Sequence, residues 1–119
     1  DGTPIAVAGE PVPARAVVHV PDAAAFERRG LAEAHAAVRA AYPRTRGYFD
    51  CFGHAMAAEG SFAAAVDLGL AHWDLAASRV LVEEAGGVVL TRPGARPGTT
   101  DAVLGSPQVA PRVAALLGF

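Results

Sequence analysis

Short β-branched or apolar runs alternate with longer helical segments along the chain, and this alternation constrains the fold more than any other feature. The strand-like runs are bounded by proline, glycine or aspartate, as strands in a layered domain usually are. The predicted strands span residues 14–20, 44–49, 62–68, 88–91 and 102–105, and the predicted helices span residues 23–42, 51–59, 73–85 and 107–117. This order predicts an α/β fold, a layered mixed sheet of about five strands flanked by helices.

Two of the predicted helices carry internal signals. Gly30 weakens the middle of helix 23–42, because glycine is a poor helix former. Helix 73–85 is the clearest element of the chain, and Gly86-Gly87 ends it. Its apolar residues recur at positions i, i+3, i+4, i+7 and i+8, which predicts that one face packs on the sheet. These residues are Trp73, Ala76, Ala77, Val80 and Leu81.

Composition excludes several classes of protein. The chain has 119 residues and is 52% hydrophobic, enough for one compact domain and too short for two. A net charge of −2 leaves no basic surface for nucleic acid. The apolar stretches are interrupted before they reach the length of a bilayer, so we expect no membrane partner. A single cysteine, Cys51, and the lack of a signal-peptide pattern favour a cytoplasmic protein.

Three aspartates stand at the ends of predicted elements. Asp50 lies between strand 44–49 and helix 51–59, Asp67 lies near the end of strand 62–68, and Asp74 lies at the start of helix 73–85. Each has an ordinary structural explanation, since aspartate commonly caps helices and ends strands. Arg46 and Asp50 are as well explained by a weak local ion pair as by ligand binding.

Cysteine and histidine offer two further combinations. Cys51 and His54 stand at i and i+3 on a predicted helix, a spacing that permits a nucleophile pair, although buried packing is the commoner explanation. His72 and Asp74 alternate and could share a metal ion with Asp50, but no cluster has zinc-like spacing. His19 and His35 read as ordinary residues of a strand and a helix.

Four short motifs resemble a known family. The run Trp73-Asp74-Leu75-Ala76-Ala77, followed by Glu83-Glu84-Ala85-Gly86-Gly87, resembles the second signature of the inositol monophosphatase superfamily, W-D-x-A-A and then E-A-G-G. Upstream, the segments 44–50 and 58–60 resemble the R-T-R-G-Y-G-D and A-E-G motifs of histidinol-phosphate phosphatases. The resemblance covers roughly the whole chain. Phe49 and Ser78 depart from it, since relatives usually carry glycine at both positions.

The resemblance implies a chemistry and a set of roles. It implies a Mg2+-dependent phosphomonoesterase in which Asp74 ligates the metal, a role that suits the preference of Mg2+ for hard oxygen ligands. Asp50 and Asp67 would contact the non-phosphate part of the substrate, and Arg46 the substrate or its phosphate. Histidinol phosphate is the expected substrate, because its ammonium and imidazole groups need anionic partners. An inositol or sugar phosphate remains the alternative.

The first residues need separate treatment. Asp1-Gly2-Thr3 imitates the family's first metal signature, D-P-[IL]-D-G-T, but it lies too close to Asp74 and better matches a later turn that leads into a strand. We therefore assign residues 1–13 to the end of an upstream strand and turn region, and residues 14–119 to the C-terminal domain of the phosphatase fold.

In this assignment the remaining metal ligands and the water-activating threonine lie outside the chain, and no catalytic residue is assigned within it. We expect the chain to be inactive alone and to pair with a missing N-terminal half or a homodimer partner. The absent domain should leave an apolar surface. The rival hypothesis is a non-catalytic binding or assembly module that has the same fold.

Overall fold

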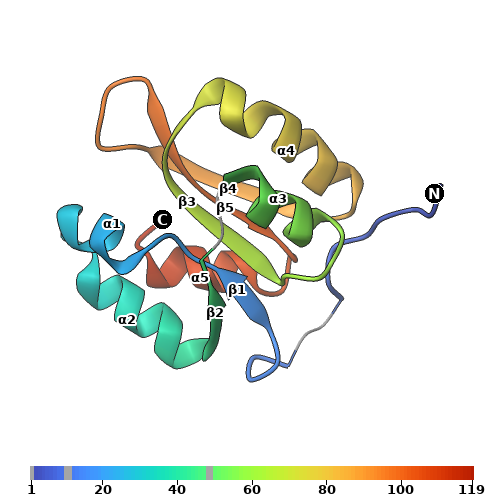
Figure 1. Cartoon of the computed structure of the whole chain (residues 1–119), viewed down its shortest axis with the longest axis horizontal. Helices are drawn as coiled ribbons and strands as arrows, with labels where there is room; N and C mark the ends of the chain where they lie inside the picture. The colour runs from blue at the N-terminus through green and yellow to red at the C-terminus, as the bar shows by residue number, and fades with distance from the viewer. Residues whose placement is uncertain (1, 10–11, 48–49) are drawn as a thin grey trace.

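The computed structural model describes residues 2–9, 12–47 and 50–119. These residues form five strands and five helices around one sheet (Figure 1). In chain order the elements are β1 (Val17–His19), α1 (Ala23–Arg28), α2 (Ala32–Ala41), β2 (Arg44–Arg46), α3 (Asp50–Ala58), β3 (Ala64–Ala71), α4 (His72–Glu84), β4 (Val88–Pro93), β5 (Thr99–Gly105) and α5 (Ala110–Leu116). The predicted α/β fold with a mixed five-stranded sheet is confirmed.

The sheet has the strand order β2-β1-β3-β5-β4. Strands β2, β1 and β3 run parallel because helices connect them, whereas β3, β5 and β4 pair antiparallel. Strands β4 and β5 are longer than predicted, so the expected loop 92–100 shrinks to the turn of a hairpin. Strand β3 runs to Ala71, three residues beyond its predicted end, and leads directly into α4.

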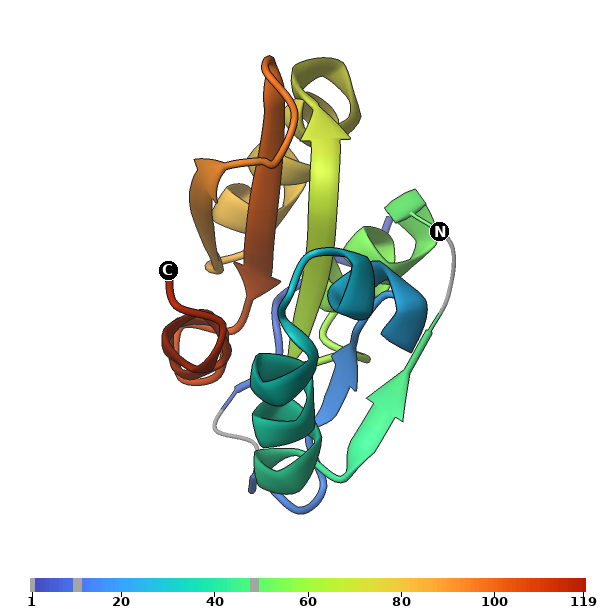
Figure 2. The same ribbon diagram turned by 90° about the vertical axis from the view of Figure 1, so that its left-hand side faces the viewer.

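Alternate residues of the central strands face the two helical layers. Val66 of β3 and Val103 of β5 belong to the core beneath α1, α2 and α5, while Ala65 and Leu104 belong to the core beneath α3 and α4. This is the two-residue period of a strand buried on both faces. Figures 1 and 2 show the helices divided between the two faces in this way.

The helix predicted over residues 23–42 is wrong in one respect, because it is two helices. Gly30 adopts a φ of +67°, a left-handed conformation that ends α1. The amide of Leu31 then donates to the carbonyl of Phe26 at 2.9 Å, which closes the turn. Helix α2 folds back on α1, and the His35 ring stacks on Phe26 with ring centroids 4.5 Å apart. The ring of His35 is thus part of the core, as an ordinary helix residue would be.

The predicted packing face of α4 is also wrong. Trp73, Val80 and Leu81 are 70%, 58% and 51% exposed, and the two alanines between them are exposed too. The sheet is instead covered by Leu75, Val82 and their neighbours on the opposite side. Both sides of α4 are apolar enough to be buried, so periodicity alone did not decide between them. The exposed side is called the α4 outer face below.

Residues 2–9 lie along the domain without forming a helix or strand. The amide of Val7 donates to the carbonyl of Ala85 at 3.0 Å, which ties this segment to the end of α4. Gly2 has a φ of +82°, as residues of tight turns often do, while Asp1 lies outside the described residues. No helix among the described residues has the length and apolarity needed to cross a bilayer.

Candidate functional site

A cavity of about 470 Å3 lies where β3 ends and α4 begins. Its polar lining comes from three successive elements: His54 of α3, Asp67 of β3 and Asp74 of α4. The remaining lining residues are Cys51, Leu68, Gly69 and Leu70. The cavity is called the Asp67–Asp74 cavity below. It brings together two of the carboxylates that the sequence singled out.

An irregularity in β3 shapes this cavity. The pairing of β3 with β5 shifts register between Asp67 and Leu70, which is where a β-bulge re-aims neighbouring side chains. Gly69 takes a φ of +80° inside this bulge, a conformation that a residue with a side chain rarely adopts. The bulge therefore depends on glycine at this position.

The Gly69 amide is held from behind by Asp101. It donates to Oδ1 of Asp101 at 3.0 Å, and Arg29 donates to both oxygens of the same carboxylate at 2.7 and 3.1 Å. The Nε of Arg92 adds a bond of 3.1 Å. Burial alone would raise the pKa of Asp101, but the hydrogen bonds from Arg29 and Arg92 outweigh it and hold the pKa below its ordinary value. Asp101 is thus an ionised structural anchor behind the bulge.

Asp74 does not act as a helix cap. The N-cap of α4 is Ala71, which has no side-chain capping bond, and Asp74 is the third residue of the helix. The Asp74 side chain is exposed and makes no hydrogen bond or ion pair within the described part of the chain. A carboxylate in the first turn is favoured by the helix dipole, yet both its oxygens remain able to accept bonds from a ligand.

Asp67 is fixed by a buried histidine. His54 is 2% exposed, and its Nε2 lies 3.1 Å from Oδ2 of Asp67 while its Nδ1 lies 2.9 Å from Oγ of Ser78. An ionised carboxylate only accepts, so Nε2 carries the hydrogen and donates it to Asp67. The Ser78 hydroxyl can donate to a neutral Nδ1 or accept from a protonated one. Asp67 keeps further acceptor capacity towards the cavity.

The chain Ser78-His54-Asp67 has the residue types of a hydrolytic triad but the opposite arrangement. In that triad the aspartate bonds Nδ1 and the serine bonds Nε2. Here the two nitrogens are exchanged, and Ser78 is 7% exposed on the buried side of α4. The serine hydroxyl therefore does not face the cavity as a nucleophile would. This network orients Asp67 and does not itself attack a substrate.

The other candidates have separate outcomes. The Arg46 guanidinium donates to the carbonyl of Thr45 at 2.8 Å on the edge strand β2 and does not line the cavity. Asp50 begins α3, but its side chain lies outside the described residues. The Cys51–His54 pair is not formed, because Asp67 and Ser78 occupy both ring nitrogens. His72 lines a different cavity.

The residues present fit a hard divalent cation in part. No group of three or more potential metal-ligating side chains is found within residues 2–9, 12–47 and 50–119. Asp74, with Asp67 on the same cavity, nevertheless offers the one or two carboxylates through which proteins usually bind Mg2+, the other positions being water and substrate phosphate. Asp74 would hold the ion, because Asp67 already accepts from His54.

The sequence does not predict that Ser78 and His54 belong to this site. Ser78 is conspicuous in the sequence only because it replaces a glycine of the resembling family, and His54 only because it follows Cys51. Nothing in the sequence shows that a strand, two helices and a bulge bring these side chains to Asp67. The one sequence signal was His54, a polar residue in the predicted helix 51–59, which otherwise consists largely of small residues.

Comparisons with known proteins give the family and the fold of this chain. A family model described as the inositol monophosphatase family matches residues 6–117. Among solved structures, an inositol monophosphatase from Zymomonas mobilis is 21% identical with a TM-score of 0.79, and the match covers 100% of this chain and 48% of that one. For the extragenic suppressor protein SuhB from Bartonella henselae, the values are 18%, 0.81, 99% and 47%.

A third structure, inositol monophosphatase-II from Staphylococcus aureus, is 16% identical with a TM-score of 0.79 and coverages of 94% and 43%. At these identities the structures show a shared fold, and the chain spans about half the length of each. A search of curated protein sequences gives no significant match. Because the family model matches nearly the whole chain, the chain belongs to the inositol monophosphatase family.

Proposed function

We propose that this chain is the C-terminal half of a Mg2+-dependent phosphatase that hydrolyses a small phosphate monoester. The observation that carries the proposal is the Asp67–Asp74 cavity, in which one carboxylate is fixed by a histidine and the other has no partner among the residues that the structure describes. Two solved structures of this fold support the substrate class, since one holds inositol monophosphate and the other holds 2'AMP.

The two aspartates would have different tasks. A bound Mg2+ supplies Lewis acidity and lowers the pKa of a coordinated water. Asp74 would hold that ion, since both its oxygens are available. Asp67, with its carboxylate oriented by His54, would accept hydrogen bonds from the alcohol part of the substrate. Asp50 and Arg46 are proposed as further contacts to that part or to the phosphate.

Histidinol phosphate is the proposed substrate within this class. Its ammonium and imidazole groups need carboxylate partners, and a fixed carboxylate such as Asp67 is pre-organised to provide one. Resemblance of segments 44–50 and 58–60 to the histidinol-phosphate branch points the same way. A panel of histidinol, inositol and sugar phosphates separates the alternatives, and a preference of at least tenfold in kcat/KM for an uncharged polyol phosphate would refute this assignment.

The missing half is proposed to cover the α4 outer face. Trp73, Val80 and Leu81 expose large apolar surfaces on one side of a single helix, which is uncommon on a monomer. A second copy of the chain is the alternative partner. Light scattering of the chain alone should show self-association that Leu81→Glu weakens, whereas a monodisperse wild-type monomer would count against both partners.

The metal-binding step can be tested on the chain itself. Mn2+ added to 15N-labelled protein should broaden the amide signals around Asp74 and Asp67 first. Asp74→Asn should abolish this selective broadening, while Glu84→Gln at the opposite end of α4 should leave it unchanged. Equal broadening in both variants would show that the cation binds the surface without a site.

The catalytic step needs the complete reading frame. If the DNA upstream of the Asp1 codon encodes E-E and D-P-x-D-G-T segments in frame, the full protein should release phosphate from histidinol phosphate with Mg2+, and Asp74→Asn should abolish the release. The 119-residue chain alone should be inactive. Robust turnover by the chain alone would refute the half-enzyme proposal, and an inactive complete protein would favour a binding or assembly module.

A further inference from the structure

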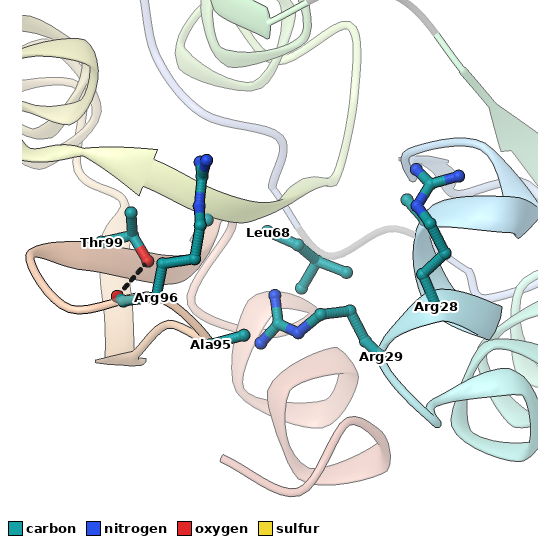
Figure 3. Close-up of a pocket in the computed structure, with 8 residues that line it drawn as sticks. Arg28, Arg29, Leu68, Ala95, Arg96 and Thr99 are labelled. Carbon is teal, nitrogen blue, oxygen red and sulfur yellow. Dashed lines mark hydrogen bonds between the residues drawn. The ribbon is translucent and has the colours of Figure 1, made fainter.

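A second cavity, of about 220 Å3, lies on the other side of the β3 bulge and is lined by three arginines (Figure 3). Arg28 and Arg29 come from the end of α1, and Arg96 comes from the turn between β4 and β5. Figure 3 shows Arg29 between the other two, with Leu68 at the wall. This space is called the arginine cavity below.

The charges around the arginine cavity do not balance. Arg29 is neutralised by Asp101, which lies behind the wall and is fully buried. For Arg28 and Arg96, no ion pair is found within the described part of the chain. No carboxylate is among the residues that line the cavity. Two exposed arginines without an ion pair among the described residues therefore line a space that a small anion could enter.

Each arginine has a local explanation, but neither explanation accounts for both of them lining one cavity. Arg28 is in the last turn of α1, where a cation interacts favourably with the helix dipole. Arg96 stands in a turn whose backbone is fixed by Thr99, which donates from both its amide and its hydroxyl to the Arg96 carbonyl. Neither reason requires the two side chains to share one cavity. Like charges placed together repel, so their arrangement favours a bound counter-ion.

We propose that the arginine cavity binds a small oxyanion, phosphate or the phosphoryl group of a small ester. Guanidinium groups present paired donors that match phosphate oxygens, and Arg29 is already held rigid by its bidentate bond to Asp101. The cavity volume is several times the roughly 30 Å3 that one water molecule occupies. It therefore has room for phosphate with accompanying water.

The arginine cavity and the Asp67–Asp74 cavity share a wall. Leu68 and Gly69 line both of them, and the Gly69 amide is held by Asp101. An anion among the arginines would thus lie across the bulge from the proposed substrate. The inference does not require the chain to be half of a phosphatase, because it concerns a separate set of side chains.

Inorganic phosphate titrated into the 15N-labelled chain at constant ionic strength tests this site. Saturable shifts are expected for the amides of Gly69, Arg96 and Thr99. Arg28→Ala and Arg96→Ala should each weaken binding by roughly tenfold, the effect of removing one charge-assisted hydrogen bond. Arg112→Ala, which removes the same charge from the exposed surface of α5, should leave the affinity unchanged.

Three outcomes would overturn the proposal. Shifts that rise linearly without saturation would mean that there is no site. Equal weakening by Arg112→Ala and Arg28→Ala would mean that net charge alone attracts phosphate. Loss of binding in Asp74→Asn, or a requirement for Mg2+, would place the anion in the Asp67–Asp74 cavity instead. Failure of the phosphatase assay, by contrast, would leave this site unaffected.

Discussion

Asp101 and Asp74 are the same residue type on opposite sides of the β3 bulge, but one is buried and the other is exposed. Asp101 is fully buried and accepts hydrogen bonds from Arg29, Arg92 and the Gly69 amide. Asp74 is exposed on a polar cavity and has no partner within the described residues. One carboxylate is fully used by the fold, and the other is left available.

Within one small domain, Asp101 thus has a structural role, whereas Asp74 is available to bind a ligand. A buried charge must be paired, because its desolvation is costly. An exposed carboxylate needs no partner to be tolerated, and at the start of α4 it gains only the small stabilisation of the helix dipole. Asp67 is intermediate, since His54 fixes it and the cavity still reaches it. The following variants test the comparison.

Asp101→Asn should produce the largest loss of stability. The neutral amide keeps the shape but leaves Arg29 and Arg92 without their counter-charge, which we expect to cost roughly 3 kcal/mol, the lower end for breaking a buried pair because both guanidiniums retain some solvent. Urea unfolding measures it. A loss below about 1 kcal/mol would show that the arginines are satisfied without Asp101.

His54→Leu should come next. The substitution keeps an apolar body but removes the partner of both Asp67 and Ser78, which we expect to cost about 1–3 kcal/mol. Thermal unfolding measures the loss, and His54→Gln, which can still donate to Asp67, should recover part of it. In an active complete protein, His54→Leu should raise KM more than it lowers kcat. An unchanged KM would mean that Asp67 does not need this orientation.

His35 adds an acid sensitivity that must be separated from that of Asp101. Burial, aided by the charge of Arg39 and opposed by Glu27, lowers the pKa of His35 below its ordinary 6.5. The unfolded chain then binds a proton more readily, so stability falls as the pH drops from about 6.5 through the lowered pKa. Urea unfolding at several pH values should show this slope, and His35→Phe should remove it.

The contribution of Asp101 should disappear only in stronger acid. Its folded pKa lies below the ordinary 3.8, so its stabilisation is complete above that value and is lost as the pH falls towards the lowered pKa. Asp101→Asn should remove the acid transition below about pH 4 but leave the His35 slope intact. If a single variant removed both, the two groups would be coupled.

Asp74→Asn should have the smallest effect on stability. It gives up only the favourable interaction of a charge with the helix dipole, which we expect to be less than about 1 kcal/mol. Urea unfolding beside Glu84→Gln provides the comparison. A loss as large as that of Asp101→Asn would mean that Asp74 has a structural task, and the contrast between the two aspartates would fail.

Several features of the fold were predictable from local patterns. The alternation of strands and helices predicts the α/β class, and Gly86-Gly87 marks the end of α4. Gly30 predicts a weak point in the helix but not a helix end, because its left-handed φ depends on how α2 returns over α1. The buried side of α4 could not be chosen, since two apolar sides competed.

The sequence by itself determined the order of the elements, the family resemblance and the position of Asp74, because these follow from local periodicity and from motifs of adjacent residues. The tertiary structure alone decided which carboxylates are used and which remain available. His54, Asp67 and Ser78 meet, and Asp101 captures two arginines, only after the sheet and its bulge have formed. Hydrogen bonding and desolvation act across distances in the chain that no local pattern records.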